Sequence, residues 1–226
     1  MEHGNHHAAD SSEPAEPGRG SPQTPEAVSG FWDQRYSEKP ALWSGRPNAA
    51  LVSEIRGLQP GRVLDVGCGE GADAVWLAEQ GWEVTALEVS TVALDRAARQ
   101  AARRGVTVTW LHSGLVEAAL PPASFDLVSA QYPALLRTGD KAAEFALLHA
   151  VAPGGTLLVV HHQLPADPDT SAHSAALRDY VGLADVAALL DENWHLEVHE
   201  TRPRNVSTGA GAHHTEDVVL RARRLR

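Results

Sequence analysis

The chain has 226 residues, 43% of them hydrophobic, which is enough to bury one sizeable core. Its 19 basic and 29 acidic residues give a formal net charge of -10, and this charge disfavours general binding to nucleic acid. A single cysteine, Cys68, excludes an internal disulfide framework and a cysteine-based zinc site. No apolar run approaches the ~20 residues of a membrane helix, and the N-terminus lacks the pattern of a secretory signal. We therefore expect a cytoplasmic protein with no membrane partner.

The first 28 residues differ in composition from the rest of the chain. Pro, Gly, Ser, Glu and His dominate there, and large apolar side chains are almost absent. Such a segment cannot bury enough surface to offset the entropy of ordering it. We expect a disordered tail over residues 1–28, with solvated histidines at positions 3, 6 and 7, and one folded domain over residues 29–226.

Strand and helix patterns alternate through that domain. Short apolar runs predict strands at 62–66, 83–88, 106–111, 125–130 and 156–160. Helical patterns fall at 72–80, 91–104, 141–151 and 185–193. Two further strands, 195–201 and 215–222, are joined by a loop without a helix, which suits an antiparallel pair. The alternation predicts an α/β fold, a Rossmann-like doubly wound sheet of seven strands that is mostly parallel with an antiparallel last strand.

Ligands of such sheets bind beyond the carboxyl ends of the strands, so the residues after each strand carry the functional prediction. The strongest pattern is the glycine loop Val63-Leu-Asp-Val-Gly-Cys-Gly-Glu-Gly-Ala72, which lies between a predicted strand and a predicted helix. Glycines permit a tight turn and a close approach of a ligand to the main chain. The free N–H groups at the start of the following helix suit a carboxylate or a phosphate.

Two cofactors compete for this loop. Gly67, Gly69 and Ala72 fit the dinucleotide pattern G-x-G-x-x-A. Gly67, Gly69 and Gly71, preceded by Asp65, fit D-x-G-x-G-x-G, which resembles motif I of the class I S-adenosylmethionine-dependent methyltransferases. The Asp65 carboxylate would repel a pyrophosphate, whereas it suits the ammonium group of a methionine moiety. We therefore favour S-adenosylmethionine, with an NAD-dependent oxidoreductase as the alternative.

Two further segments are predicted to contact the nucleoside. Glu88 ends the second strand, where an acceptor-only carboxylate can bind both ribose hydroxyls, and the adenine edge is expected beside Val89 and Ser90. After the third strand the resembling family usually has an aspartate that accepts from the adenine amino group. This chain departs from that pattern with Ser113 and Gly114, whose hydroxyl or main-chain groups are expected to substitute.

The strings Phe31-Trp-Asp-Gln-Arg-Tyr36 and Leu42-Trp-Ser-Gly-Arg-Pro-Asn48 add a narrower resemblance, to the tellurite-resistance and thiopurine-type small-molecule methyltransferases. This resemblance implies that the N-terminal segment caps the cofactor and that Trp43 contacts it. Tyr36 either lines the pocket or seals the edge of the sheet. An aromatic face near a sulfonium cation is attractive. The class I resemblance covers about residues 30–162 and implies that the seventh strand runs antiparallel between the fifth and the sixth.

Residues after the fourth and fifth strands are expected to face the methyl group. Gln131 is assigned to the cofactor, and Tyr132 and His161 are the catalytic candidates. His162 is an alternative base, and simple packing or solvation of these histidines is a further alternative. His213 and His214 should approach the same edge. Adjacent histidines in a strand point to opposite faces, so the four cannot all converge, and we expect no metal.

The sequence therefore predicts a class I methyltransferase that uses S-adenosylmethionine and a small-molecule acceptor with a sulfur, oxygen or nitrogen nucleophile. A thiolate acceptor needs no base, whereas an oxygen or nitrogen acceptor of high pKa needs one. The alternatives are an NAD-dependent oxidoreductase and a non-catalytic S-adenosylmethionine-binding module. The acceptor and the oligomeric state stay open.

Overall fold

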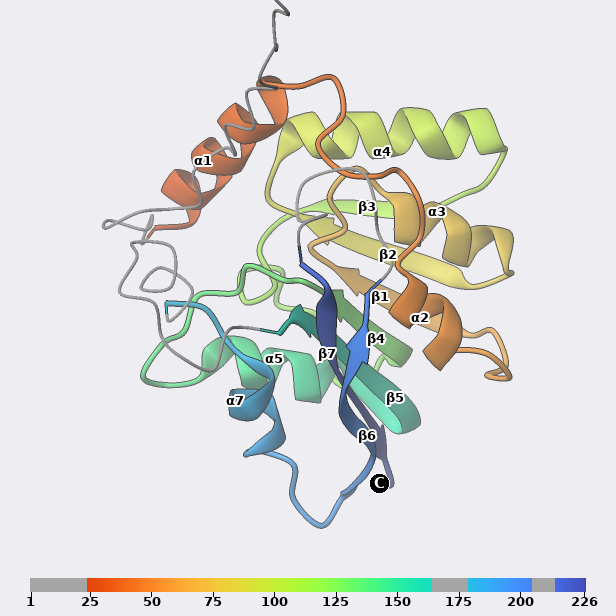
Figure 1. Ribbon diagram of the computed structural model, residues 1–226, viewed down its shortest axis with the longest axis vertical. Coiled ribbons are helices and arrows are strands. Elements are labelled where there is room, and N and C mark those ends of the chain that lie inside the picture. The colour runs from red at the N-terminus through yellow and green to blue at the C-terminus, as the bar shows by residue number, and fades with distance from the viewer. Residues whose placement is uncertain (1–23, 164–178, 205–213) are drawn as a thin grey trace, which may run out of the picture.

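The computed structural model describes residues 24–163, 179–204 and 214–226 (Figure 1). Its helices are α1 (Pro25–Ser37), α2 (Ala49–Glu54), α3 (Ala72–Glu79), α4 (Thr91–Arg104), α5 (Ala142–Ala150) and α7 (Leu183–Ala187). Its strands are β1 (Arg62–Val66), β2 (Glu83–Glu88), β3 (Thr109–His112), β4 (Phe125–Gln131), β5 (Val151–His162), β6 (Trp194–Pro203) and β7 (Glu216–Arg224).

The strands form one seven-stranded sheet in the order β3-β2-β1-β4-β5-β7-β6. The neighbours among β1 to β5 pair in parallel, and β7 runs antiparallel to both β5 and β6. This order confirms the predicted Rossmann-like sheet and the place of its last strand. In the β5–β7 pair, His162 lies opposite Asp217, which brings the start of β7 to the edge where the parallel strands end.

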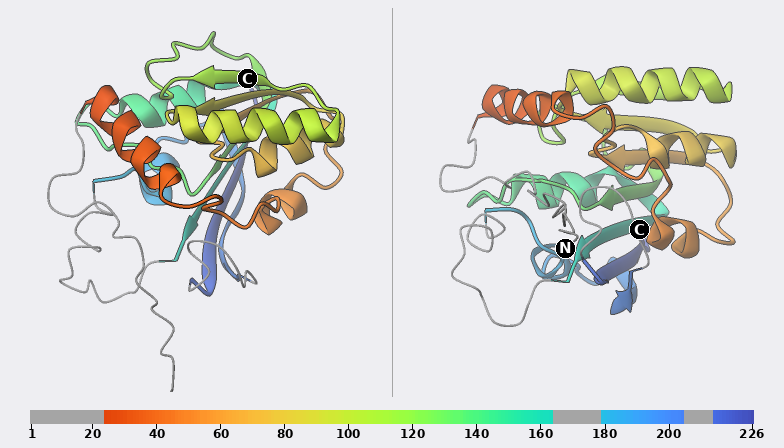
Figure 2. Two further views of the ribbon diagram at one scale, coloured as in Figure 1. Left: turned by 90° about the horizontal axis from the view of Figure 1, so that it is seen from above. Right: turned by 45° about the horizontal axis from the view of Figure 1, so that its top comes forward.

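Helices cover both faces of the sheet, with α2, α3 and α4 on one side and α5 and α7 on the other (Figures 1 and 2). Successive residues of a central strand point to opposite faces, and both faces are buried. Val63 and Leu64 of β1 are both fully buried, but Val63 packs in the cluster beside α3 and Leu64 in the cluster beside α5. The burial explains why these strands are continuous apolar runs.

Helix α1 was not among the predicted elements. Thr24 caps it, Pro25 occupies its first turn and Glu26 complements its dipole, which together are a standard helix start. It packs against α4 (Figure 2), and Asp33 accepts hydrogen bonds from the Ser90 hydroxyl at 2.6 Å and the Val92 N–H at 3.2 Å. Residues 25–28, predicted to belong to the disordered tail, are therefore helical. The remainder of that predicted tail, residues 1–23, lies outside the described residues.

Other boundaries differ from the predictions for local reasons. The third strand is Thr109–His112 instead of 106–111, and the last helix is Leu183–Ala187 instead of 185–193. Beyond Ala187 the chain tightens into i→i+3 hydrogen bonds, and Asp191 then accepts from the Asn193 and Trp194 N–H groups, which turns the chain into β6. Residues 153–155, Pro-Gly-Gly, lie within β5 at the point where its register with β4 shifts. Within the described ranges, no helix is long and apolar enough to cross a membrane.

Candidate active site

A cavity of about 660 Å³ lies at the carboxyl ends of the parallel strands, beneath α1 and the segment that follows it. The described chain places all but two of the predicted site residues on its wall. Those that line it are Trp43, Asp65, Gly67, Gly69, Glu88, Val89, Ser113, Gly114, Gln131, Tyr132 and His161. These predicted residues therefore lie around one cavity, and their individual roles stay predictions.

The two exceptions, Gly71 and Ser90, have structural contacts of their own. Gly71 has a φ of +83°, and a Cβ atom there would lie 2.6 Å from the Cβ of Ala97 in α4, so the glycine is needed for helix packing. The Ser90 hydroxyl donates to Asp33 and accepts from the Ala93 N–H, which makes it the N-cap of α4. Neither residue is among those that line the cavity, and their cofactor contacts stay predictions.

Asp65, near the end of β1, is a buried carboxylate. Its Oδ2 atom has no hydrogen-bond partner, and no basic side chain of residues 24–163, 179–204 or 214–226 forms an ion pair with it. Burial, followed by the negative charges of Asp73 and Glu88, raises its pKa well above the usual range. Asp73 is bonded differently, because both the backbone N–H and the side-chain amide of Asn48 donate to it at 2.7 Å. The free Asp65 oxygen therefore marks a position that fits a cationic group.

Glu88 shapes the glycine loop from the end of β2. Its carboxylate accepts from the Gly69 N–H and from the Ser90 N–H, each at 2.9 Å. Burial raises the pKa of Glu88, and these two hydrogen bonds oppose that shift. Each carboxylate oxygen has a second lone pair, so Glu88 can also accept from a vicinal diol.

The segment between α1 and α2 is tied to the glycine loop. Glu70 accepts from the backbone N–H groups of Leu42 and Trp43 and pairs with Arg96 at 2.8 Å. The Trp43 Nε1–H donates to the Tyr36 hydroxyl at 2.9 Å, and a Cβ at Gly69 would lie 2.9 Å from the same hydroxyl. The aromatic pair therefore lies directly over the loop, and both rings line the cavity.

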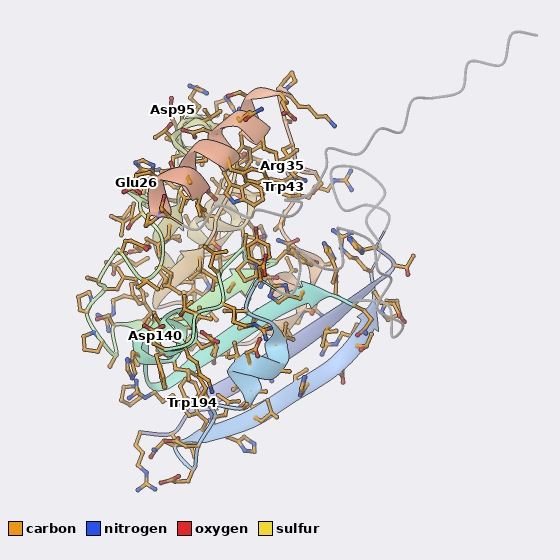
Figure 3. The ribbon with its side chains drawn as sticks, turned by 90° about the vertical axis from the view of Figure 1, so that its left-hand side faces the viewer. Glu26, Arg35, Trp43, Asp95, Asp140 and Trp194 are labelled. Carbon is orange, nitrogen blue, oxygen red and sulfur yellow. The ribbon has the colours of Figure 1, made fainter. Side chains whose placement is uncertain are left out.

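Arg35 is a cavity residue that the sequence reasoning missed. It is only 8% exposed, its Nε–H is buried without a partner, and no carboxylate of the described chain forms an ion pair with it. Its guanidinium lies 5.5 Å from the centre of the Trp32 ring, and Arg35 and Trp43, both labelled in Figure 3, line the same cavity. A buried cation without an anion is costly, so this position fits a negative group. The Thr24-Pro-Glu helix start is the signal that would have placed Arg35 on a helix over the site.

The other end of the cavity contains Gln131 and His161. The Gln131 amide donates to the Ser129 hydroxyl at 3.0 Å, while its Oε1 is buried without a partner. The His161 Nε2 is likewise buried without a partner. Burial, together with the neighbouring His162, lowers the pKa of His161 to about 4, so its ring is neutral at physiological pH. A buried amide oxygen and a buried ring nitrogen without partners therefore line this region.

Tyr132 follows β4 with a φ of +52°. Its hydroxyl donates to Asp217 Oδ2 at 2.8 Å and accepts from Arg204 Nε at 3.3 Å. Burial raises the pKa of Tyr132, so the phenol stays protonated.

Of the predicted histidines near this edge, His214 stacks on His162 with ring centres 3.9 Å apart, whereas His213 lies outside the described residues. Burial also raises the pKa of the Cys68 thiol well above its usual range.

Comparison with known proteins shows that part of the chain is similar to methyltransferases. Residues 63–155 match a family described as a methyltransferase domain. An uncharacterized methyltransferase of Mycobacterium tuberculosis is 39% identical over 117 residues, which cover 51% of this chain and 58% of that protein. A ubiquinone biosynthesis O-methyltransferase of Xylella fastidiosa is 32% identical over 134 residues, 58% of this chain and 54% of that protein. The chain thus matches little more than half the length of these relatives.

A solved structure has the same fold. The N-methyltransferase NodS from Bradyrhizobium japonicum, in complex with S-adenosylhomocysteine, superposes with a TM-score of 0.60 and 17% identity, over 87% of this chain and 88% of that chain. The narrower resemblance to tellurite-resistance and thiopurine methyltransferases stays a prediction. Residues 63–155 thus match the methyltransferase domain family, and they lie in a seven-stranded sheet that has the fold of a solved methyltransferase.

Proposed function

We propose that this protein transfers a methyl group from S-adenosylmethionine to a small-molecule acceptor with a sulfur, oxygen or nitrogen nucleophile. The observation that carries the proposal is the buried Asp65 carboxylate, whose Oδ2 has no partner. Asp65 occupies the aspartate position of the motif I pattern, two residues before the first glycine of the loop. A pyrophosphate placed there would meet an uncompensated negative charge, whereas an ammonium group would neutralise it. When bound, S-adenosylmethionine supplies a methyl group already activated by a sulfonium.

The charges on the cavity wall are complementary to a zwitterionic nucleoside. Asp65 would hold the ammonium, and the buried Arg35 guanidinium would hold the carboxylate of the amino-acid end. Glu88 would accept the two ribose hydroxyls. Trp43 and Tyr36 would present aromatic rings near the positive sulfur. The protein's contribution to methyl transfer is then alignment of the reactants and exclusion of water.

Further residues of the wall have proposed contacts with the rest of the cofactor. Val89, Ser113 and Gly114 line the cavity beyond Glu88, where the adenine would lie, and Gln131 would offer its free Oε1 to the cofactor. Tyr132 and His161, which also line the cavity, would face the acceptor, and their catalytic roles stay predictions.

The volume of the cavity and the net charge of the protein favour a small acceptor. A cavity of about 660 Å³ lies within the ~300–1,000 Å³ typical of small-molecule sites. The net charge of -10 opposes association with RNA or DNA. The similar proteins named above include an O-methyltransferase and an N-methyltransferase, so oxygen and nitrogen acceptors deserve the first assays.

Calorimetry and an acceptor screen test the proposal. S-adenosylhomocysteine is expected to bind at micromolar or lower Kd and NAD not to bind, while the opposite pattern would reject the proposal in favour of an oxidoreductase. Incubation with deuteromethyl-labelled S-adenosylmethionine and a panel of thiols, phenols, hydroxyquinolines and ring N–H heterocycles should yield labelled products in mass spectrometry. Binding of the cofactor without transfer to any acceptor would favour a non-catalytic binding module.

A further inference from the structure

The His162 ring, at the end of β5, is held on three sides. One face stacks on the Tyr132 ring, with centres 4.2 Å apart and planes inclined by 25°. The other face stacks on His214, with centres 3.9 Å apart and planes inclined by 12°. Its Nδ1 lies 3.2 Å from Asp217 Oδ1, the residue opposite it in the β5–β7 register. The ring is therefore fixed in orientation by two stacking contacts and one hydrogen bond.

This arrangement also fixes the tautomer. An ionised carboxylate only accepts hydrogen bonds, so the contact with Asp217 requires the proton to be on Nδ1. The neutral ring then carries its lone pair on Nε2, which forms no hydrogen bond with a residue of 24–163, 179–204 or 214–226. His162 lines the cavity, and its side chain is 22% exposed. The lone pair is thus available to a ligand in the cavity.

We propose that His162, oriented by Asp217, is the catalytic base of this protein and that its acceptor carries an O–H or N–H proton which Nε2 removes. The inference rests on the proposed methyl transfer and specifies its acceptor class. Asp217 is a positioning residue, since it would act only through the imidazole. The pairing of a histidine with a carboxylate that orients it is a general arrangement for proton abstraction.

The neighbouring groups are less suited to this role. His161 has a pKa of about 4, too low to accept a proton from a phenol or a ring N–H at neutral pH. The Tyr132 hydroxyl donates a hydrogen bond to Asp217, and burial raises the pKa of Tyr132, so this phenol is a poor base. Arg204 lies 3.5 Å from Asp217, so it offsets part of the carboxylate charge that would stabilise a protonated His162. Its guanidinium also lies 5.4 Å from the centre of the Tyr132 ring.

The acceptor's O–H or N–H proton passes to the Nε2 lone pair of His162, which becomes a cationic imidazolium beside Asp217. The electron pair left on the acceptor oxygen or nitrogen forms the bond to the methyl carbon. The bond between that carbon and the sulfonium sulfur breaks, and its electron pair goes to the sulfur. The proton is then released to water, which restores the neutral base.

The first test needs no acceptor. Nitrogen-15 NMR of histidine-labelled protein, with His162→Gln used for assignment, should show the neutral His162 ring protonated at Nδ1 and bare at Nε2. In Asp217→Asn the side-chain amide can donate to Nδ1, so the tautomer protonated at Nε2 should gain population. A neutral ring protonated at Nε2 in the unmodified protein would overturn the proposal, whatever the acceptor.

The second test compares two matched acceptors, 4-methylphenol and 4-methylbenzenethiol, at mildly alkaline pH, where the thiol is ionised and the phenol is not. His162→Gln should lower kcat for the phenol by about 100-fold or more and leave kcat for the thiol unchanged. Asp217→Asn should lower kcat for the phenol less, and it should move the rising limb of the pH profile of kcat. His195→Gln, an exposed histidine of β6 outside the cavity, is the control and should change neither rate.

Calorimetry with S-adenosylhomocysteine separates this proposal from the proposed function. Unchanged Kd in His162→Gln shows that the variant is folded and that its defect concerns proton removal. Equal losses with phenol and thiol, or no loss with the phenol, would overturn the role of His162 while leaving methyl transfer intact. Absence of cofactor binding and of methyl transfer in the unmodified protein would instead reject the proposed function.

Discussion

The two ends of the cavity are built in different ways. The cofactor end, after β1 and β2, contains Asp65 and Arg35, neither of which has a partner of opposite charge in the described chain. The acceptor end, after β4 and β5, joins Tyr132 to Asp217, 85 positions apart, and balances that carboxylate with Arg204. Under the proposed function a charged ligand would complete the first end, whereas the second end balances the charge of Asp217 within the protein.

The largest expected effect tests the rigidity of the cofactor end. In Gly71→Ala the new Cβ would lie 2.6 Å from Ala97 Cβ, at a φ of +83°. Left-handed strain of about 1–2 kcal/mol and overpacking of about 1–3 kcal/mol should together lower the free energy of unfolding by about 2–5 kcal/mol. Urea denaturation without ligand measures this loss.

Gly67→Ala is the matched control for that variant. Gly67 has a φ of +71°, but a Cβ there meets no protein atom within 4 Å, and the residue lines the cavity. It should lose only the strain of about 1–2 kcal/mol in stability, and should weaken cofactor binding as well. Equal stability losses in the two variants would contradict the assignment of Gly71 to helix packing.

The second effect separates affinity from stability at Asp65. Asp65→Asn should weaken S-adenosylhomocysteine binding by about 2–5 kcal/mol, because it removes the partner of a buried ammonium. Without ligand the same variant should be more stable than the unmodified protein at neutral pH, because it removes a buried uncompensated charge. Asp126→Asn, at the opposite end of the sheet and half exposed, should leave the affinity unchanged. A variant that lost stability without ligand would contradict this view of Asp65.

The effect of Asp65 on the free energy of unfolding should depend on pH. The folded-state pKa of Asp65 is raised, so its ionisation destabilises the fold. The destabilisation is complete above the raised pKa and disappears as pH falls to the ordinary carboxyl pKa of about 3.9. In denaturation curves without ligand, Asp65→Asn should therefore gain stability relative to the unmodified protein as pH rises through this window.

The same contrast explains what could be predicted from the sequence. β1, the glycine loop and Glu88 follow from local patterns, since a strand, a turn and a helix start specify one another over a few residues. The contacts of Tyr132 and His162 with Asp217 depend on the register of β5 with β7, which no short pattern encodes. The antiparallel order did predict that His214 would approach this edge.

Helix packing around the site was also harder to predict from the sequence. Gly71 and Ser90 belong to the loop pattern, but their positions relative to the cavity depend on how closely α4 and α1 pack behind them. Arg35 was missed because the tail composition extended to residue 28 and hid the helix start at Thr24. Local motifs could be identified from the sequence, whereas the packing of the loop against α1 and α4 could not be predicted from it.

The third effect concerns the ribose. Glu88→Ala should weaken S-adenosylhomocysteine binding by about 1–3 kcal/mol, since it removes a pair of charge-assisted hydrogen bonds. The variant also loses the acceptor for the Gly69 and Ser90 N–H groups, so the loop itself should loosen. Calorimetry with 2′-deoxy S-adenosylhomocysteine as a second ligand isolates the ribose contribution. The deoxy ligand should lose affinity for the unmodified protein and little for the variant, and equal losses would contradict the ribose assignment.

The smallest expected effect tests whether the acceptor end is independent of the cofactor end. Tyr132→Phe removes the hydroxyl that bonds Asp217 but keeps the ring that stacks on His162. It should lower the free energy of unfolding by about 0.5–1.5 kcal/mol, the contribution of one hydrogen bond, and leave S-adenosylhomocysteine affinity unchanged. Tyr36→Phe removes a hydroxyl that bonds Trp43 over the glycine loop, and it should weaken that affinity instead. If Tyr132→Phe also weakened cofactor binding, the two ends would be one coupled site and the contrast between them would fail.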